Sequence, residues 1–537
     1  MSDDDRFDLG TGPVPTPQRV ATSSDGVIST QHWEASRVGA SVLSAGGNAV
    51  DAAVAASLAL GVCEPAASGI GGQTMMLIHI AEPRTTFALD GSSRAPHRAV
   101  QDQFNSHDEL KRGHRATTVP STLATLDYAL SQYGTMSFAS ILDPVIALAE
   151  EGFVVSELQQ RLVKRELEHL RAGSAGRFYL DPHGNPPAIG DTFRHPVLAK
   201  TLRRLADHGV ADFYQGEIAR HIHQDMMDND GLIRDDDLAQ IPVPIERRPV
   251  TCRFGSARVV TFPPPGAGRT LIEMLNIYSA LPESLRDFDE PKGALALASV
   301  IRQGLRDRRD RPYDPEYYQQ VDDRQMTDRS YAEAVAKRIR KGMRKPRRPI
   351  PSSGETTHLS VMDRYGNAVA LTQSIERVYG SFEASPELGF LYNKYMSAFD
   401  YEDMSHPYYL RPNAVPWASV APTVVFRGTR PWLTIGSPGS ERIAPTVLQV
   451  MLRLMSERPL DAVSAPRLHC SLKGRVSIEA SRVRSDVLRT LVDHGFEINR
   501  RDPYSFYLGC CQLVLRIRGG LLGVADPRRD GAAEGAS

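Results

Sequence analysis

Cysteine, net charge and long apolar runs are all scarce in this sequence. Its 537 residues include five cysteines, of which Cys510 and Cys511 are adjacent and the others isolated. Since no second pair offers the remaining ligands of a metal clip, we expect buried thiols. A formal charge of −1 gives the chain no overall electrostatic reason to bind nucleic acid or an anionic membrane. No run of about 18 apolar residues is present, so no membrane-spanning helix is predicted.

Common cofactor and metal motifs are missing as well. The sequence has no G-x-x-x-x-G-K-[S/T], H-E-x-x-H or G-x-S-x-G pattern. The glycine-rich residues 69–72 follow a predicted helix and precede a predicted strand, which is the reverse of the order in a dinucleotide site. We therefore expect no metal and no cofactor. The acidic N-terminus lacks the apolar stretch of a signal peptide, so the chain as given is expected to be cytoplasmic.

What is present is the pattern of a layered globular protein, with 41% hydrophobic and 24% charged residues. Helical spacing over 33–45 is followed by a second predicted helix over 49–62, whose nearly all-apolar composition requires burial on every side. Residues 74–80 and 85–89 predict a β-hairpin. The first 25 residues are expected to form a flexible segment. Helical patterns dominate about 120–240 and 269–310, and β-character returns at 250–262.

A basic, proline-containing segment leads directly into a second predicted hairpin. Eight lysines and arginines crowd residues 337–355. A nucleic-acid arm would need interleaved aromatic residues, and none occur there, so an exposed linker is predicted. Residues 356–362 then alternate like a strand, and 367–375 read as the returning strand.

A threonine at the start of this hairpin suggests one catalytic hypothesis. A threonine hydroxyl is a weak nucleophile and needs a nearby base. If the bond between Glu355 and Thr356 is cut, the freed α-amino group, whose ordinary pKa is about 7.7–8.0, becomes that base. The same hydroxyl can perform the cut by attacking the carbonyl of Glu355. From this segment alone, an ordinary threonine-rich edge strand is the alternative.

Blocks spread along the chain connect this hairpin with a known family. In order they are G-G-N-A-V-D-A (46–52), S-G-I-G-G (68–72), T-T-H-L-S-V (356–361) with G-N-A-V-A (366–370), and G-S-P-G (436–439). Together they resemble the γ-glutamyltransferase (glutathione hydrolase) family, from about residue 25 to about residue 525.

The resemblance implies the α+β fold of an N-terminal-nucleophile hydrolase, a four-layer αββα sandwich cut by itself into two subunits. The large subunit would comprise the flexible segment 1–25, a core over 26–336 and the linker 337–355. The small, catalytic subunit would be 356–537. The two subunits from one precursor, together with a small acyl or amide substrate, are the partners that the resemblance predicts.

The resemblance also implies roles for the catalytic residues. Thr356 would be the nucleophile, and its amine the base. Ser374 stands where the family has a threonine whose hydroxyl contacts the nucleophile. Gly439 and Ser440 replace a Gly-Gly pair whose backbone N–H groups form an oxyanion hole. His358 is expected to form structural hydrogen bonds instead of taking part in catalysis.

The predicted substrate site departs from the family pattern. Ser92 occupies the position of an arginine that grips the glutamyl α-carboxylate, and Arg94 lies two residues further on. The aspartate that holds the α-ammonium falls at Ala398, and a neighbouring substrate-binding asparagine falls at Glu376. Ser419 matches one of two serines that line the site. Because lost charge-assisted bonds of this kind are worth roughly 1.5–3 kcal/mol each, the sequence predicts a substrate other than a standard γ-glutamyl peptide.

Three alternatives stay open from the sequence. The chain could be a genuine γ-glutamyltransferase in which Arg94 or Arg377 replaces the missing clamp. It could be a biosynthetic relative that cleaves another acyl bond, including a C–C bond next to a carbonyl. It could also be a catalytically dead binding scaffold, although Thr356, Ser374 and Gly439 are retained.

Overall fold

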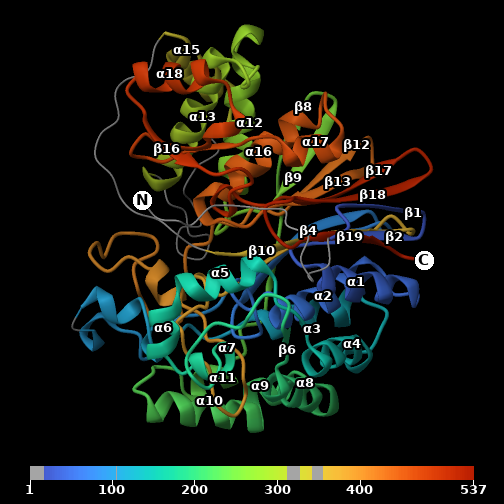
Figure 1. Ribbon diagram of the computed structural model, residues 1–537, viewed down its shortest axis with the longest axis vertical. Coiled ribbons are helices and arrows are strands. Elements are labelled where there is room, and N and C mark those ends of the chain that lie inside the picture. The colour runs from blue at the N-terminus through green and yellow to red at the C-terminus, as the bar shows by residue number, and fades with distance from the viewer. Residues whose placement is uncertain (1–16, 105, 311–326, 342–354) are drawn as a thin grey trace.

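Two seven-stranded sheets stacked on each other form the centre of the molecule. The computed structural model describes residues 17–104, 106–310, 327–341 and 355–537. Helices cover the outer face of each sheet, which gives four layers (Figure 1). The predicted α+β class and αββα sandwich are therefore confirmed.

The strand order of each sheet is given by its hydrogen-bonded neighbours. The first sheet runs β1 (Val20–Ser23), β18 (Gly520–Ala525), β17 (Gln512–Ile517), β13 (Arg430–Gly436), β12 (Thr423–Arg427), β9 (Ala257–Thr261) and β8 (Val250–Phe254). The second runs β19 (Ala532–Gly535), β2 (Gly26–Thr30), β10 (Thr357–Asp363), β11 (Ala368–Ser374), β3 (Gln73–Ile80), β4 (Thr85–Gly91) and β7 (Ile245–Arg247). Smaller sheets are formed by β14 (Leu468–Cys470), β15 (Arg475–Glu479) and β16 (Glu497–Arg501), and by β5 (Phe153–Val154) and β6 (Thr192–Phe193).

The helices divide between the two outer layers (Figure 1). On the side of the second sheet lie α1 (Trp33–Ser44), α2 (Ala49–Cys63), α3 (Thr122–Tyr133), α4 (Phe138–Glu151), α5 (Glu157–Arg165), α6 (Leu167–Ala172), α7 (Gly176–Tyr179), α8 (Pro196–His208), α9 (Ala211–Gln215), α10 (Glu217–Asp228) and α11 (Asp235–Ala239). On the side of the first sheet lie α12 (Gly268–Ala280), α13 (Pro291–Asp310), α15 (Arg329–Arg340), α16 (Ile443–Arg453), α17 (Pro459–Ser464) and α18 (Ser485–Asp493). None of the helices in the described part of the chain combines the length and apolar character needed to cross a bilayer.

Helix α2 packs beneath the centre of the second sheet, as its apolar sequence predicts. The Asn48 side chain accepts hydrogen bonds from the N–H groups of Val50 and Asp51, and the Asp51 carboxylate accepts one from the N–H of Asn48. This capping box fixes the start of the helix. The helix then contacts β10 and β11, the strands of the predicted second hairpin.

The hairpin of β10 and β11 occupies the middle of the second sheet. Strand β10 pairs antiparallel with β2 on one side and with β11 on the other. Thr357 lies opposite Gln373, so Thr356 and Ser374 meet at the open end of the hairpin. An inner strand flanked on both sides is a rigid support, and the alternative of an edge strand is therefore wrong.

The structure changes two sequence-based boundaries. Residues 20–23 form β1, which pairs with β18, so the part of the N-terminal segment from 20 onward is ordered in a sheet; residues 1–16 lie outside the described residues. Helix α15 extends to Arg340, so the first residues of the predicted linker are helical. Lys337, Arg338 and Arg340 are basic because they lie on the exposed side of this helix, and the sequence analysis assigned this run of charges to a linker. Residues 342–354 lie outside the described part of the chain.

Candidate active site

The bond between Glu355 and Thr356 lies immediately before β10. In this structure the two residues are joined in one chain, and Thr356 is buried, with 5% of its surface exposed. The N–H of Glu355 donates to the carbonyl of Glu376 at 2.6 Å, which continues the pairing of the hairpin past its formal end. The backbone around this bond is therefore held in place on the side of β11.

Ser374 contacts the carbonyl that precedes Thr356. Its Oγ donates a hydrogen bond to the carbonyl oxygen of Glu355 at 2.6 Å and accepts one from the N–H of Glu376 at 2.8 Å. The second bond orients the hydroxyl so that its proton points at the carbonyl oxygen. A donor in this position stabilises negative charge on that oxygen when the carbonyl carbon is attacked.

Tyr395 is a neighbour that the sequence did not single out. It begins the short 3-10 helix η5 (Tyr395–Ala398), and its phenol shares a hydrogen bond with Ser374. Burial raises the pKa of this phenol, and the nearby Glu376 raises it further. Tyr395 is therefore a neutral hydrogen-bonding group beside the serine.

Two arginines from distant parts of the sequence hold Glu355. Arg529 Nη2 donates to the Glu355 carboxylate at 2.8 Å, and its Nη1 donates to the Thr356 carbonyl at 3.1 Å. Arg442 Nη2 lies 3.8 Å from the same carboxylate. Glu64, at the end of α2, accepts from Arg529 Nη1 at 2.8 Å and from the hydroxyl of Thr357. The residues on both sides of the bond are thus held by one guanidinium.

Gly439 and Ser440 lie at the start of a helical segment close to this point. Their φ angles are +117° and +52°, so a left-handed turn leads into the 3-10 helix η6 (Ser440–Arg442) and then into α16. The serine adopts a conformation that costs a non-glycine residue free energy. Backbone N–H groups at a helix N-terminus favour a negative charge. Arg442, which contacts Glu355, ends η6 and places this loop beside the bond between Glu355 and Thr356.

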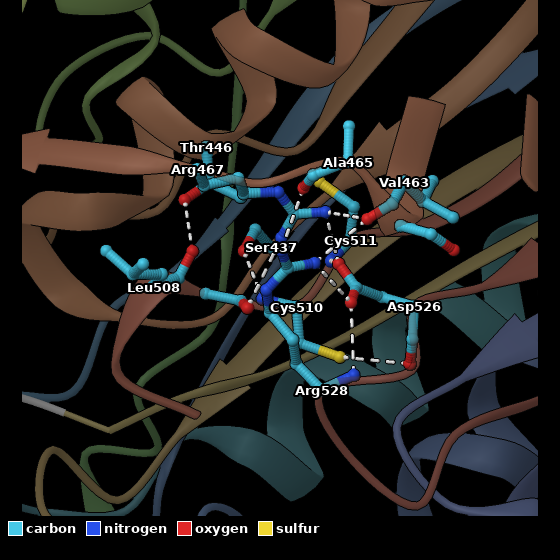
Figure 2. Close-up of polar contacts among 12 residues, drawn as sticks. Ser437, Thr446, Val463, Ala465, Arg467, Leu508, Cys510, Cys511, Asp526 and Arg528 are labelled. Atoms are coloured by element: carbon cyan, nitrogen blue, oxygen red, sulfur yellow. Dashed lines mark hydrogen bonds and ion pairs between the residues drawn. The ribbon is translucent and has the colours of Figure 1, made fainter. Parts of the chain in front are cut away.

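A buried ionic network lies close to Ser437, which precedes that loop in the sequence (Figure 2). Arg528 donates to both carboxylate oxygens of Glu479 at 2.8 Å and to Asp526 at 3.0 Å, and all three side chains have no exposed surface. Asp526 also pairs with Arg467 and accepts from the N–H of Cys511 at 2.9 Å. Attractions to two arginines outweigh desolvation and lower the pKa of Asp526.

The network reaches the loop of Gly439 and Ser440 through Cys510. Its N–H donates to the Oγ of Ser437 at 3.0 Å, two residues before Gly439. Four of the five thiols are buried as predicted, and Cys252 is partly exposed. Burial raises the pKa of Cys511 to about 12, so this thiol stays protonated and its residue serves the structure through its backbone.

His358 has the structural role that the sequence predicts. Its ring nitrogens lie 2.8 Å from the Thr372 hydroxyl and 3.1 Å from that of Ser360. The side chain is completely buried, and burial lowers its pKa to about 3. The ring is therefore neutral at physiological pH.

The residues predicted to bind substrate are divided between two places. Ser92 donates to Asp90 at 2.6 Å, and Asp90 accepts from Arg247 at 2.7 Å, so the position of the missing arginine is filled by an internal network. Arg94 lines a separate cavity of about 240 Å³ whose lining does not include Thr356. A backbone bridge between Arg94 and Val119 fixes this orientation.

The other predicted substrate residues lie nearer the bond between Glu355 and Thr356. Glu376 is bonded through its backbone to both Glu355 and Ser374; burial raises the pKa of its carboxyl to about 7, against the attraction of Arg377 and Lys394. Ala398 ends η5, the helix that Tyr395 begins. These roles stay predictions.

Ser419 contacts Arg308, an arginine that the sequence analysis did not single out. Its hydroxyl accepts a hydrogen bond from Arg308 Nη1 at 3.1 Å, and Arg308 lies over the ring of Trp417, 4.8 Å from its centroid. Burial lowers the pKa of Arg308 to about 10.

Across the described ranges, no group of three or more His, Cys, Asp or Glu side chains could hold a metal ion.

Comparisons with known proteins cover nearly the whole chain. The family model for gamma-glutamyltranspeptidase matches residues 35–536. The chain belongs to the gamma-glutamyltranspeptidase family. It is 31% identical over 534 residues to a glutathione hydrolase proenzyme of Escherichia coli (strain K12), which covers 94% of this chain and 91% of the relative. It is 30% identical over 548 residues to the acylase ACY 1 proenzyme of Pseudomonas sp. (strain V22), covering 97% and 96%.

Solved structures agree with the family assignment. The crystal structure of cephalosporin acylase from Bacillus halodurans superposes with a TM-score of 0.88 at 25% identity, covering 99% of both chains. The gamma-glutamyltranspeptidase of Helicobacter pylori superposes with a TM-score of 0.54 at 32% identity, over 57% of this chain and 90% of that one. The chain is thus an N-terminal-nucleophile hydrolase of this family, with hydrolase or transferase activity.

Proposed function

We propose that this gamma-glutamyltranspeptidase family member is a precursor that cuts itself between Glu355 and Thr356 and then cleaves amides through an acyl-Thr356 intermediate. The observation that carries the proposal is the hydrogen bond from Ser374 Oγ to the Glu355 carbonyl at 2.6 Å. Arg529 adds support, because it binds residues on both sides of the same bond. These contacts orient and polarise the peptide bond between Glu355 and Thr356.

Self-cleavage follows from the threonine hydroxyl. Thr356 Oγ attacks the carbonyl carbon of Glu355, the C–N bond breaks, and the Oγ proton ends on the freed α-amino group. Water then hydrolyses the resulting ester, so that Glu355 gains a carboxylate and the Thr356 hydroxyl is restored. The large subunit would hold 355 residues and the small one 182.

The processed enzyme would repeat this chemistry on an external amide. The α-amino group of Thr356 takes the Oγ proton while Oγ bonds to the substrate carbonyl carbon, and the amine leaves with that proton. The N–H groups of Gly439 and Ser440 would stabilise the oxyanion. Water or an amine then accepts the acyl group. We further propose that the acyl group is not the zwitterionic γ-glutamyl group, since Ser92 is bound to Asp90 and position 398 carries an alanine methyl group.

Mass analysis of the purified enzyme tests this proposal. We expect two fragments of about 39 and about 20 kDa, in proportion to the 59.1 kDa of the whole chain, the smaller with an N-terminal threonine. An amide substrate quenched during turnover should add its acyl mass to Thr356. An active enzyme that remains one chain would rule the mechanism out.

Removing the Ser374 hydroxyl should slow self-cleavage. In Ser374→Ala the Glu355 carbonyl loses its donor, and we expect the rate of conversion of precursor to fragments to fall by about a hundredfold. A time course of purified precursor on a denaturing gel measures this rate. Ser374→Thr, which keeps the hydroxyl, should restore most of it, while Ser477→Ala removes a buried hydroxyl in β15 and should process normally. Normal processing of Ser374→Ala would contradict the role given to this hydrogen bond.

A further inference from the structure

A cavity of about 270 Å³ lies in the helical layer outside the first sheet, in the upper part of Figure 1. Residues of α16, α18, β14 and β15 line it, together with residues 288–289 before α13. Neither Glu355 nor Thr356 is part of its lining. Asp289 is the one carboxylate among the described residues that line it, whereas the lining arginines are Arg453, Arg467, Arg482 and Arg484. The wall of this cavity is therefore rich in positive charge.

Two of these arginines each have a buried N–H group without an acceptor. The side chains of Arg453 and Arg467 are 7% and 2% exposed. The Nε atom of each has no hydrogen-bond partner within the described part of the chain. A buried donor that lacks an acceptor destabilises a protein, and such donors normally bind a protein group, water or an ion. An anionic oxygen bound in the cavity would supply an acceptor for these arginines.

The buried arginines next to the cavity outnumber the buried carboxylates that pair with them. Arg467 and Arg528 both pair with Asp526 (Figure 2). Arg482 and Arg528 both pair with Glu479. Both carboxylates have no exposed surface. Three guanidiniums thus share two carboxylates, which leaves one positive charge in excess on the inner side of the cavity.

The carboxylates on the outer side of the cavity are all exposed to solvent. Arg453 pairs there with two acids and Arg484 with two more, and between 31% and 56% of each acidic side chain is exposed; they are Asp289, Glu457, Glu290 and Asp486. Water and salt screen exposed charges much more than buried ones. The excess charge of the buried arginines therefore attracts an anion into the cavity.

The rest of the lining indicates what kind of anion fits. Phe288, Val483 and Val487 are apolar members of the wall, and the Arg453 guanidinium lies over the Phe288 ring, 4.5 Å from its centroid. An inorganic ion would leave this apolar surface in contact with water, whereas a ring or a short alkyl chain would cover it. Apolar walls with a few charged groups are typical of sites for small organic molecules.

We propose that this cavity binds a small organic carboxylate, whose anionic group contacts Arg453, Arg467 and Arg482 and whose apolar body packs against Phe288 and α18. The site is separate from the bond between Glu355 and Thr356. It therefore does not depend on the proposed self-cleavage.

Three probes test the site on the full-length enzyme. Benzoate has a carboxylate and a ring, benzamide has the ring without the charge, and acetate has the charge without the ring. In calorimetric titrations at constant ionic strength, we expect the Kd for benzoate to be at least about tenfold below the Kd for either of the others. Benzoate should also raise the melting temperature. Equal affinity for benzamide or acetate, or no binding of benzoate, overturns the proposal.

Variants of two lining residues should change the affinity in opposite directions. Arg453→Gln should weaken benzoate binding at least about tenfold. Asp289→Asn should strengthen it about threefold, because it removes a carboxylate that competes for Arg453. Arg458→Gln alters an 86% exposed arginine paired with Asp461 and should keep the wild-type Kd. If Arg453→Gln does not fold, the 56% exposed Asp289 still provides the test. An unchanged Kd in either folded variant overturns the assignment.

The Thr356→Ala chain separates this site from the catalytic one. Its cavity is unaltered, so benzoate should bind with the wild-type Kd whether or not the chain is cut. Loss of benzoate binding in Thr356→Ala would place the ligand at the catalytic site and overturn the proposal. Absence of self-cleavage in the wild type would reject the proposed function and leave this measurement valid.

Discussion

Thr356→Ala should remain one chain of about 59 kDa and lose amide hydrolysis by at least about 10⁴-fold. The substitution removes the attacking oxygen, and because the bond to Glu355 then stays intact, no α-amino group is released to act as base. Removal of Thr356 Oγ therefore abolishes both self-cleavage and amide hydrolysis. A denaturing gel measures the first loss, and turnover of an amide substrate measures the second.

Two further variants separate this chemistry from a folding defect. Thr356→Ser keeps a hydroxyl and an N-terminal amine, so it should produce both fragments and retain activity above the alanine variant. Thr192→Ala alters an exposed threonine in the short strand β6 and should behave as wild type. Two fragments of the expected sizes from Thr356→Ala would show that another group cuts the chain.

Arg528→Ala should lower the free energy of unfolding by about 3 kcal/mol or more. The change removes the cation that Glu479 and Asp526 share and leaves each buried carboxylate with one other arginine, Arg482 for Glu479 and Arg467 for Asp526. Breaking part of a buried ionic network costs more free energy than losing a surface pair. Urea denaturation of the single-chain Thr356→Ala background measures the difference. The loop of Gly439 and Ser440 should also lose support, since Asp526 binds the N–H of Cys511 next to the residue that holds Ser437.

An exposed ion pair provides the comparison for this prediction. Arg458→Ala removes a partner of Asp461 at the surface and should change the free energy of unfolding by less than about 1 kcal/mol. Arg528→Lys should restore little, because a lysine cannot reproduce the two parallel bonds to Glu479. A loss below about 1 kcal/mol in Arg528→Ala would mean that the network contributes little to stability.

Local patterns predicted the elements that place Thr356, the proposed nucleophile. The apolar run of α2 and its Asn48 cap required a buried helix, and alternation required the hairpin that became β10 and β11. Each of these signals depends on residues close in sequence. They predicted that Thr356 stands at the start of a hairpin strand, but not that this strand is an inner one, which the structure shows.

Long-range charge pairing was not predictable in the same way. Arg442 and Arg529 contact Glu355 from 87 and 174 residues away, and nothing in their local sequence separates a buried arginine from an exposed one. Closeness in sequence also gave a wrong indication of closeness in space. Arg94 lies two residues from Ser92, yet its backbone bridge to Val119 places its side chain in a cavity whose lining does not include Thr356.

The strand order of the two sheets has a consequence for the molecule after the cut. Strand β2, which precedes residue 356, lies between β19 and β10, which follow it; β18 likewise separates β1 from the rest of its sheet. The two fragments are interwoven, so neither can leave without dismantling both sheets. Separation of the subunits would thus be the same event as denaturation, and the proposed cut would give the enzyme a new chain end without giving it a dissociable interface.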